Sequence, residues 1–248
     1  MLAIVETQHF ITAYYHSTMR KNILVISLLL NVLLGAGLLL VVDRLGGWTY
    51  ALFRLQHDEA GLYHHRTQLF EMMHASPGAV VFLGDSHTEQ CEWQELLRPD
   101  SFAILNRGIV GDHVQGVLDR LEEVLRHKPR RIYLMIGIND LIFRKKPEVI
   151  LPVYREIVAR IRSQSPNSEL FLQSVLPVNN QIKKIGTDND EIRALNTGIA
   201  ALARDYALPY IDLFSNLLDA NGNLDPRFTE DGIHLNGVGY AVWKQKIE

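Results

Sequence analysis

The sequence predicts an α/β fold, namely a three-layer α/β/α sandwich around a five-stranded parallel sheet, preceded by one N-terminal transmembrane helix. Three observations predict this fold. A long uncharged apolar run lies near the N-terminus, short apolar segments alternate with amphipathic segments beyond residue 76, and polar clusters follow four of the five apolar segments. Strands that alternate with helices form right-handed crossover units and a parallel sheet covered on both faces.

The apolar run over residues 22–42 is 21 residues long and holds no charged residue. A helix that rises about 1.5 Å per residue would cross the hydrocarbon core of about 30 Å with such a run. A cleaved signal peptide has a shorter apolar region, of about 7–15 residues, and a small-residue cleavage site. A soluble core helix has a polar face. We therefore expect an uncleaved transmembrane anchor, with the signal peptide and the soluble helix as alternatives.

The charges beside this run predict its orientation. Arg20 and Lys21 precede it, whereas Asp43 and Arg44 after it nearly cancel each other. By the positive-inside rule, residues 1–21 form a short cytoplasmic N-terminus, and the chain beyond the anchor is extracytoplasmic, that is, periplasmic or extracellular.

Residues 43–75 have helical composition with mixed charge, which predicts a helical stalk or linker that packs on the following domain. The histidines of this segment suggest a metal site at first sight. No two of them have the i,i+4 spacing that places two imidazoles on one helix face, and no carboxylate completes a site. We expect these histidines to be solvated: His57, His64, His65 and His74.

The composition excludes several classes of protein. With 248 residues, the chain has room for one sizeable domain and something extra. The net charge of -3 argues against a nucleic-acid binder, which normally carries a basic excess. The single cysteine, Cys91, excludes an intramolecular disulfide and a cysteine-based zinc site.

Residues 76–248 form the predicted sandwich domain. Apolar runs that look like buried strands occupy residues 79–83, 102–105, 131–136, 170–175 and 209–213. Between them, apolar residues with the spacing of one helix face recur within residues 114–125, 149–161 and 192–202. This order fits a flavodoxin-like sheet, in which ligands gather at the carboxyl ends of the strands.

The polar clusters that follow the strands lie at that edge of the sheet. Their sequences are GDSHT at 84–88, NRGIVGD at 106–112, GIND at 137–140 and DGIH at 231–234. Together they supply a serine, carboxylates, a histidine and several hydrogen-bond donors. These are the groups that acyl transfer requires.

With these motifs in this order, residues 79–248 resemble the SGNH hydrolases, also called the GDSL-like esterase/lipase family. The chain departs from the family pattern at His87, where many members have leucine. The first motif lacks the second glycine of the G-x-S-x-G elbow, so an α/β-hydrolase fold is not supported. The resemblance implies a flavodoxin-like SGNH hydrolase fold and a serine ester hydrolase.

The resemblance also implies site residues. Ser86 would be the nucleophile, and Asp231 and His234 would complete a catalytic triad. The oxyanion donors would be Ser86, Gly108 and Asn139. A histidine has the right pKa to take the serine proton, a carboxylate orients that histidine, and the donors stabilise the tetrahedral intermediate. No metal and no organic cofactor is implied.

Simpler roles stand beside these. Ser86 could cap the helix that follows it, and Asn139 or Asp231 could be turn residues. Neighbouring polar residues are expected to brace the loops through hydrogen bonds, namely Asp85, Asn106, Asp112 and Asp140. His87 and Cys91 are expected to be structural or incidental.

The resemblance and the anchor together predict a membrane-anchored serine esterase that hydrolyses an acetyl or short-chain acyl ester, on an envelope glycan or a lipid. The lysine-containing segments 141–147 and 177–190 either favour an anionic substrate or form a solvated surface. Two alternatives stay open. One is an O-acyltransferase with the same site, and the other is a non-catalytic binding module, against which the complete residue set argues.

Overall fold

The computed structural model describes residues 2–44 and 59–248, and the chain divides into two compact units, Met1–Phe53 and Arg54–Glu248. The first unit contains one long helix, α1 (Leu2–Arg44), within which Lys21–Val42 is long and apolar enough to cross a membrane. The leucines, isoleucines and valines of this stretch are almost all exposed.

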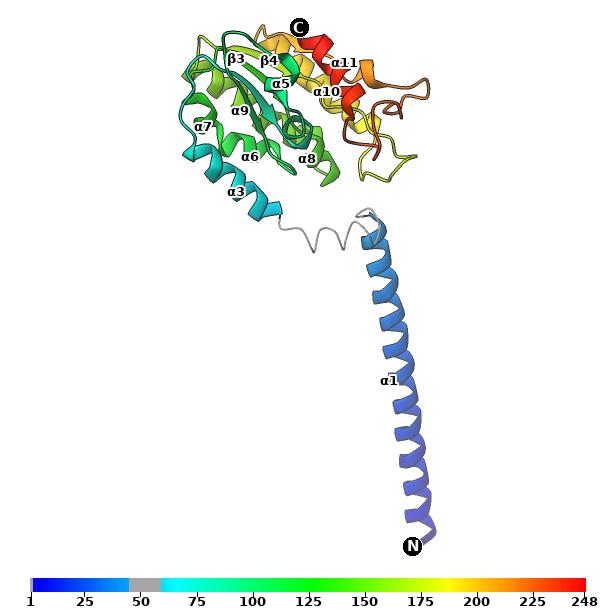
Figure 1. The fold of residues 1–248 in the computed structure, drawn as a ribbon. Coiled ribbons are helices and arrows are strands. Elements are labelled where there is room, and N and C mark those ends of the chain that lie inside the picture. The colour runs from blue at the N-terminus through cyan, green and yellow to red at the C-terminus, as the bar shows by residue number, and fades with distance from the viewer. Residues whose placement is uncertain (1, 45–58) are drawn as a thin grey trace. The chain divides into compact units, whose positions relative to one another are not determined.

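The second unit is built on one parallel sheet, as the sequence predicts (Figure 1). Its strand order is β2-β1-β3-β4-β5, the order of a flavodoxin-like fold. In chain order, the strands are β1 (Val80–Gly84), β2 (Ile104–Gly108), β3 (Arg131–Met135), β4 (Glu169–Gln173) and β5 (Tyr210–Ile211).

Helices cover both faces of the sheet, and the alternation of side chains along β1 shows which helices lie on each face. Val81 and Leu83 belong to the core shared with α6, α7, α9 and α10, whereas Val80 and Phe82 belong to the core shared with α5 and α11. The helices of this unit are α3 (Glu59–Met72), α4 (Ser86–Glu89), α5 (Trp93–Leu97), α6 (Val114–Asp119), α7 (Leu121–Leu125), α8 (Ile138–Ile142), α9 (Pro147–Gln164), α10 (Asn189–Asp205), the short 3₁₀ helix η1 (Ser215–Leu217) and α11 (Gly237–Ile247).

Three elements differ from the prediction, and the simplest difference is that the fifth strand is shorter, Tyr210–Ile211 instead of 209–213. The second strand runs to Gly108 and so includes Arg107, whose buried guanidinium lies 3.1 Å from Glu123. The single helix predicted over 114–125 is two helices, α6 and α7, that meet at Arg120. The Arg120 side chain is buried and donates to the carbonyls of Gly84 (3.0 Å) and Arg107 (2.9 Å). The two helices therefore join at the residue that ties them to the ends of β1 and β2.

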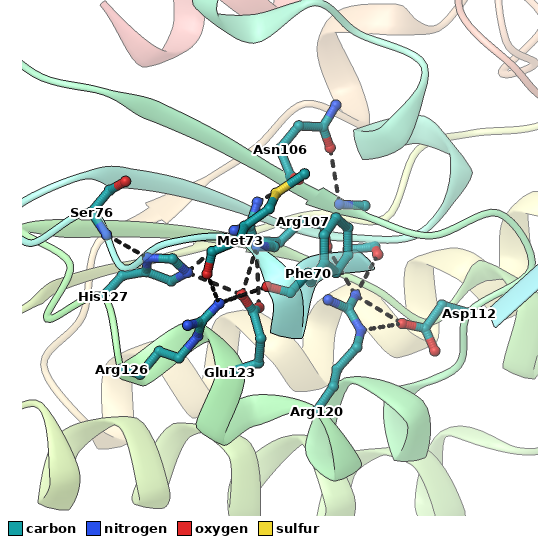
Figure 2. Close-up of polar contacts among 12 residues, drawn as sticks. Phe70, Met73, Ser76, Asn106, Arg107, Asp112, Arg120, Glu123, Arg126 and His127 are labelled. Atoms are coloured by element: carbon teal, nitrogen blue, oxygen red, sulfur yellow. Dashed lines mark hydrogen bonds and ion pairs between the residues drawn. The ribbon is translucent and has the colours of Figure 1, made fainter. Parts of the chain in front are cut away.

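Within the predicted stalk, residues 59–72 form α3, which packs on the sandwich, and residues 45–58 lie outside the described residues. Figure 2 shows the Arg126 guanidinium at the end of α3, where it donates to the carbonyls of Phe70 (2.6 Å) and Met73 (2.7 Å). Near the N-terminal end of α3, the Tyr63 hydroxyl donates to the Gly116 carbonyl at 2.9 Å.

Candidate active site

Ser86 stands at the first position of α4, directly after the carboxyl end of β1. The Asp85 carboxylate caps this helix by accepting the His87 N–H at 3.1 Å. Gly84 precedes it because the turn is tight: a Cβ at this position would lie 2.2 Å from the Met135 carbonyl oxygen. The sharp turn from a fully buried strand into α4 fixes the serine at the edge of the sheet.

The structure brings three of the predicted residues together in one hydrogen-bonded row. His234 Nε2 lies 3.0 Å from Ser86 Oγ, and His234 Nδ1 lies 2.7 Å from Asp231 Oδ2. The other oxygen of Asp231 accepts the backbone N–H groups of Ile233 (3.0 Å) and His234 (2.8 Å). Gly232, between Asp231 and Ile233, has φ +83°, and a Cβ there would lie 2.6 Å from the Asn179 carbonyl oxygen. This turn therefore needs glycine.

The Asp231 carboxylate stays ionised because of these contacts. Partial burial raises the pKa of Asp231, but hydrogen bonds from the His234 ring and from the Ile233 and His234 amides outweigh it, and the pKa ends well below its usual range. A carboxylate at Nδ1 keeps the proton on that nitrogen. The lone pair of Nε2 then faces the Ser86 hydroxyl.

The two predicted backbone donors of the oxyanion hole, Ser86 and Gly108, differ in whether their N–H groups are already hydrogen-bonded. No hydrogen bond occupies the Ser86 N–H among the described residues. The Gly108 N–H, in contrast, donates to Asn106 Oδ1 at 2.9 Å. Gly108 is a packing position instead, because a Cβ there would lie 2.2 Å from the Glu89 backbone nitrogen on α4.

A second glycine of the same motif is better suited as a donor. Gly111 has φ +76°, and within the described chain its N–H has no hydrogen-bond partner. Asn139 lies against this loop, since its side-chain amide donates to the Asp112 carbonyl at 2.9 Å. The motif NRGIVGD contains both glycines, so the sequence indicates a glycine donor but does not show which of the two it is.

The polar residues predicted to brace the loops do so. The Asn106 amide donates to the Glu89 and Cys91 carbonyls, both at 2.9 Å. Asp140 accepts the Val114 N–H at 2.9 Å and the Lys145 ammonium at 2.8 Å. The Asn106 bonds join β2 to the segment after β1, and the Val114 bond joins the segments after β2 and β3, whereas the Lys145 bond lies within the segment after β3.

Asp112 is another buried brace. It pairs with the Arg120 guanidinium at 2.8 Å, as Figure 2 shows. Burial raises the pKa of Asp112 to about 6, although the charge and hydrogen bond of Arg120 lower it. Cys91 is buried as expected for a structural residue, and burial raises the pKa of its thiol to about 12.

Known proteins share this sequence pattern. Residues 82–242 match the model of the GDSL-like Lipase/Acylhydrolase family. The chain belongs to this family. As a member of it, the protein is a carboxylic ester hydrolase with the SGNH hydrolase fold that its sheet displays.

Individual relatives are distant. A Drosophila melanogaster protein, the platelet-activating factor acetylhydrolase IB subunit beta homolog, is 25% identical over 71% of this chain and 77% of its own length. The N-acylneuraminate cytidylyltransferase of Escherichia coli is 26% identical over 63% of this chain, which covers only 37% of that enzyme. This chain therefore corresponds to about a third of the bacterial relative's length.

Solved structures repeat the fold. A Streptococcus pneumonia protein named for platelet activating factor superimposes with a TM-score of 0.68 and 26% identity, over 88% of this chain and 96% of its own. A GDSL-like lipase from Bacteroides thetaiotaomicron has a TM-score of 0.63 and 22% identity, over 75% of this chain and 94% of its own, and shows the fold alone.

Proposed function

We propose that this family member is a membrane-anchored serine esterase that hydrolyses an acetyl or short-chain acyl ester through Ser86, His234 and Asp231. The observation that carries the proposal is the unbroken row of hydrogen bonds from Ser86 Oγ through His234 to Asp231, at 3.0 and 2.7 Å. A helix cap would not need a histidine at its hydroxyl, and a turn residue would not need an imidazole at its carboxylate.

In the proposed reaction, Ser86 Oγ attacks the ester carbonyl carbon while its proton passes to His234 Nε2. The tetrahedral intermediate collapses, its carbon–oxygen bond to the alcohol breaks, and His234 gives its proton to the leaving alcohol. A water molecule, deprotonated by the same nitrogen, then hydrolyses the acyl-serine. Asp231 stays ionised throughout and stabilises the imidazolium.

The oxyanion of the intermediate would be stabilised by the Ser86 N–H, the Gly111 N–H and the side-chain amide of Asn139. We assign Gly111 in place of Gly108, because the Gly108 amide is already engaged by Asn106. The Asn139 amide nitrogen uses one of its two hydrogens on the Asp112 carbonyl, which leaves the other for substrate. Three donors fixed before the reaction are what an oxyanion hole needs.

Two observations support a short acyl group and an anchored enzyme. The Drosophila relative is by name an acetylhydrolase, and another protein of the same fold, 23% identical, is an acetyl xylan esterase. The helix Lys21–Val42 has the length and apolarity of a membrane span. An ester of an envelope glycan or lipid would be within reach of such an enzyme.

The experiment that tests the proposal uses the full chain in detergent. We expect hydrolysis of p-nitrophenyl acetate, slower hydrolysis of longer acyl esters, and loss of at least about 10³-fold in kcat for Ser86→Ala. Ser163→Ala, an exposed serine on α9, is the matched control and should keep full activity. A fluorophosphonate probe should label wild type and the control but not Ser86→Ala.

Other outcomes separate the alternatives. Labelling without turnover, with product formed when a sugar alcohol is added, would favour an O-acyltransferase. A folded protein with neither turnover nor labelling would contradict the proposed nucleophile and favour a binding module.

A further inference from the structure

His87, the residue at which the chain departs from the leucine common in its family, is completely enclosed next to the proposed triad. Its exposed fraction is 1%, and its ring centroid lies 5.5 Å from that of His234. A leucine would be the natural occupant of such a position. A histidine there must bring its polar atoms into the interior, which is costly unless both are hydrogen-bonded.

Both ring nitrogens of His87 face hydrogen-bond acceptors. Nδ1 lies 3.1 Å from Asp85 Oδ1, and Nε2 lies 2.9 Å from the backbone carbonyl oxygen of Ile233. A carbonyl oxygen cannot donate, and the Asp85 oxygen already accepts the His87 N–H. A neutral imidazole carries one N–H and can satisfy only one of these acceptors. The arrangement is complete when the ring is an imidazolium that donates from both nitrogens.

A second enclosed histidine shows the opposite arrangement. His127 is fully buried, but its Nδ1 accepts the Ser76 N–H at 2.9 Å, as Figure 2 shows, so that nitrogen carries no proton. Its Nε2 lies 3.0 Å from Glu123 Oε1. His127 is therefore a neutral histidine in the interior, and it serves as an internal reference for His87.

The groups around His87 come from three elements. Asp85 lies on its own turn, Asp231 and His234 lie on the loop before α11, and Tyr240 of α11 donates its hydroxyl to the His87 carbonyl at 2.7 Å. Burial lowers the pKa of His87, but the hydrogen bond and charge of Asp85, the Ile233 carbonyl and the charge of Asp231 outweigh it and raise the pKa overall. Burial also raises the pKa of Tyr240, which keeps its hydroxyl neutral.

We propose that His87 is a positioning residue that, as an imidazolium, holds the Ile233 carbonyl and so keeps the adjacent His234 in line with Ser86. This contact between His87 and the Ile233 carbonyl joins α4, which begins with Ser86, to the loop that carries His234. Loss of the His87 proton removes one donor. Asp85 retains its bond, since it is the charged acceptor, and the Ile233 carbonyl is released. The inference rests on the proposed triad.

The direction of the pH dependence follows. A histidine whose folded-state pKa is raised stabilises the fold fully below its unfolded pKa, about 6.5, and this contribution is lost as the pH rises through the folded pKa. Activity should therefore show an alkaline limb, on which it falls as His87 loses its proton.

Two substitutions distinguish this positioning role of His87 from a packing role. His87→Gln keeps an amide donor near the position of Nε2 but cannot titrate, so the alkaline fall should disappear while kcat stays within a few-fold of wild type. His87→Leu restores the residue common in the family and removes the donor. We expect kcat to fall about 10–100-fold at all pH values, because a displaced base attacks poorly, while KM changes little.

The charge of His87 is measured separately, by side-chain ¹⁵N spectra of the histidine-labelled full chain in detergent near pH 7. We expect two protonated nitrogens for His87 and one for His127. A neutral His87, or an alkaline limb that persists in His87→Gln, would overturn the proposal. So would a His87→Leu variant that is less stable but has unchanged kcat, since that is the behaviour of a packing residue. If wild type has no esterase activity but His87 is an imidazolium, the failure lies with the proposed function and not with this ionisation.

Discussion

At the residue scale, Asp231 illustrates how a partly exposed carboxylate stays ionised through hydrogen bonds to both of its oxygens. One oxygen accepts two backbone N–H groups and the other faces His234 Nδ1. Because its folded-state pKa is lowered, its contribution to stability is present above the unfolded pKa of about 3.9 and is lost only as the pH falls through the folded value. The proposed triad should therefore keep its carboxylate charge in mildly acidic solution.

Asp231→Asn tests this carboxylate. The amide preserves the shape of the side chain but cannot hold the imidazole in the right tautomer, so we expect kcat to fall about 10⁴-fold with the fold retained. Asp190→Asn, at a carboxylate that is 93% exposed on α10, should keep full activity. Steady-state kinetics on p-nitrophenyl acetate and a thermal unfolding curve check both variants. A loss below tenfold would remove Asp231 from the triad.

Asn139→Ala tests the oxyanion hole. Removing one prearranged donor typically costs about 10²–10³ in kcat, and KM should change little because the donor acts on the transition state. Asn139 also anchors the Asp112 carbonyl, so the unfolding temperature must be compared with wild type. Asn216→Ala is the matched control, because this asparagine of η1 is exposed and its amide donates to the nearby Asp212 carbonyl at 2.8 Å. An increase in KM with unchanged kcat would contradict the assignment.

The sequence predicts much of the site because the catalytic chemistry dictates residue types at strand ends. The four motifs predict that Ser86, Asp231 and His234 meet at one edge of the sheet, and their side chains form one hydrogen-bonded row there. They do not distinguish Gly108 from Gly111, since the direction of a backbone N–H depends on local φ and ψ and not on the residue type. His87 was expected to be structural, and its partners on a distant loop are invisible in the sequence.

At the element scale, the strands and helices were predictable where apolar residues repeat with one period, and less so where buried charges intervene. Arg107 and Arg120 are buried in a unit whose interior the sequence pattern predicts to be apolar. Arg107 extends β2 because Glu123 neutralises it. Arg120 interrupts a helix because its guanidinium is held by the Asp112 carboxylate and by two strand carbonyls. Such partners come from distant positions, so periodicity alone cannot reveal them.

The docking of α3 is also an element-scale property, and it reaches the site. Arg66 of α3 forms an ion pair with Glu89 of α4 at 3.1 Å, and Glu89 also accepts the Val110 N–H. The helix that begins at the nucleophile therefore contacts both α3 and the loop that carries Gly111. A change that loosens α3 is expected to act on this loop.

Arg126→Met tests the docking of α3. It removes the charged donor to the carbonyls of Phe70, in the last turn of α3, and of Met73, directly after the helix, and we expect a loss of about 1–3 kcal/mol in stability. Hydrogen exchange of the α3 amides should rise. Arg155→Met is the matched control: its ion pair with Asp205 is half exposed on both sides, so we expect a change within about 0.5 kcal/mol. Equal effects of the two variants would contradict a specific docking role.

At the scale of the whole molecule, the two units pose the question of where the enzyme acts. The segment Lys21–Val42 has the length and apolarity of a membrane anchor, and an N-terminal signal sequence is the alternative. The two differ in what remains after export: an anchor stays in the mature chain, whereas a signal sequence is removed. The expected orientation follows from Arg20 and Lys21, which precede the span.

We expect the full chain, expressed in bacteria with a C-terminal tag, to pellet with membranes and to resist extraction at alkaline pH. Its mass should equal that of the uncleaved chain. Ser163→Cys should react with a membrane-impermeant maleimide in intact spheroplasts, whereas Ser17→Cys should react only after lysis. The native Cys91 is buried and provides an unlabelled background. A shortened, soluble product would establish a cleaved signal sequence, and labelling of Ser17→Cys alone would reverse the orientation.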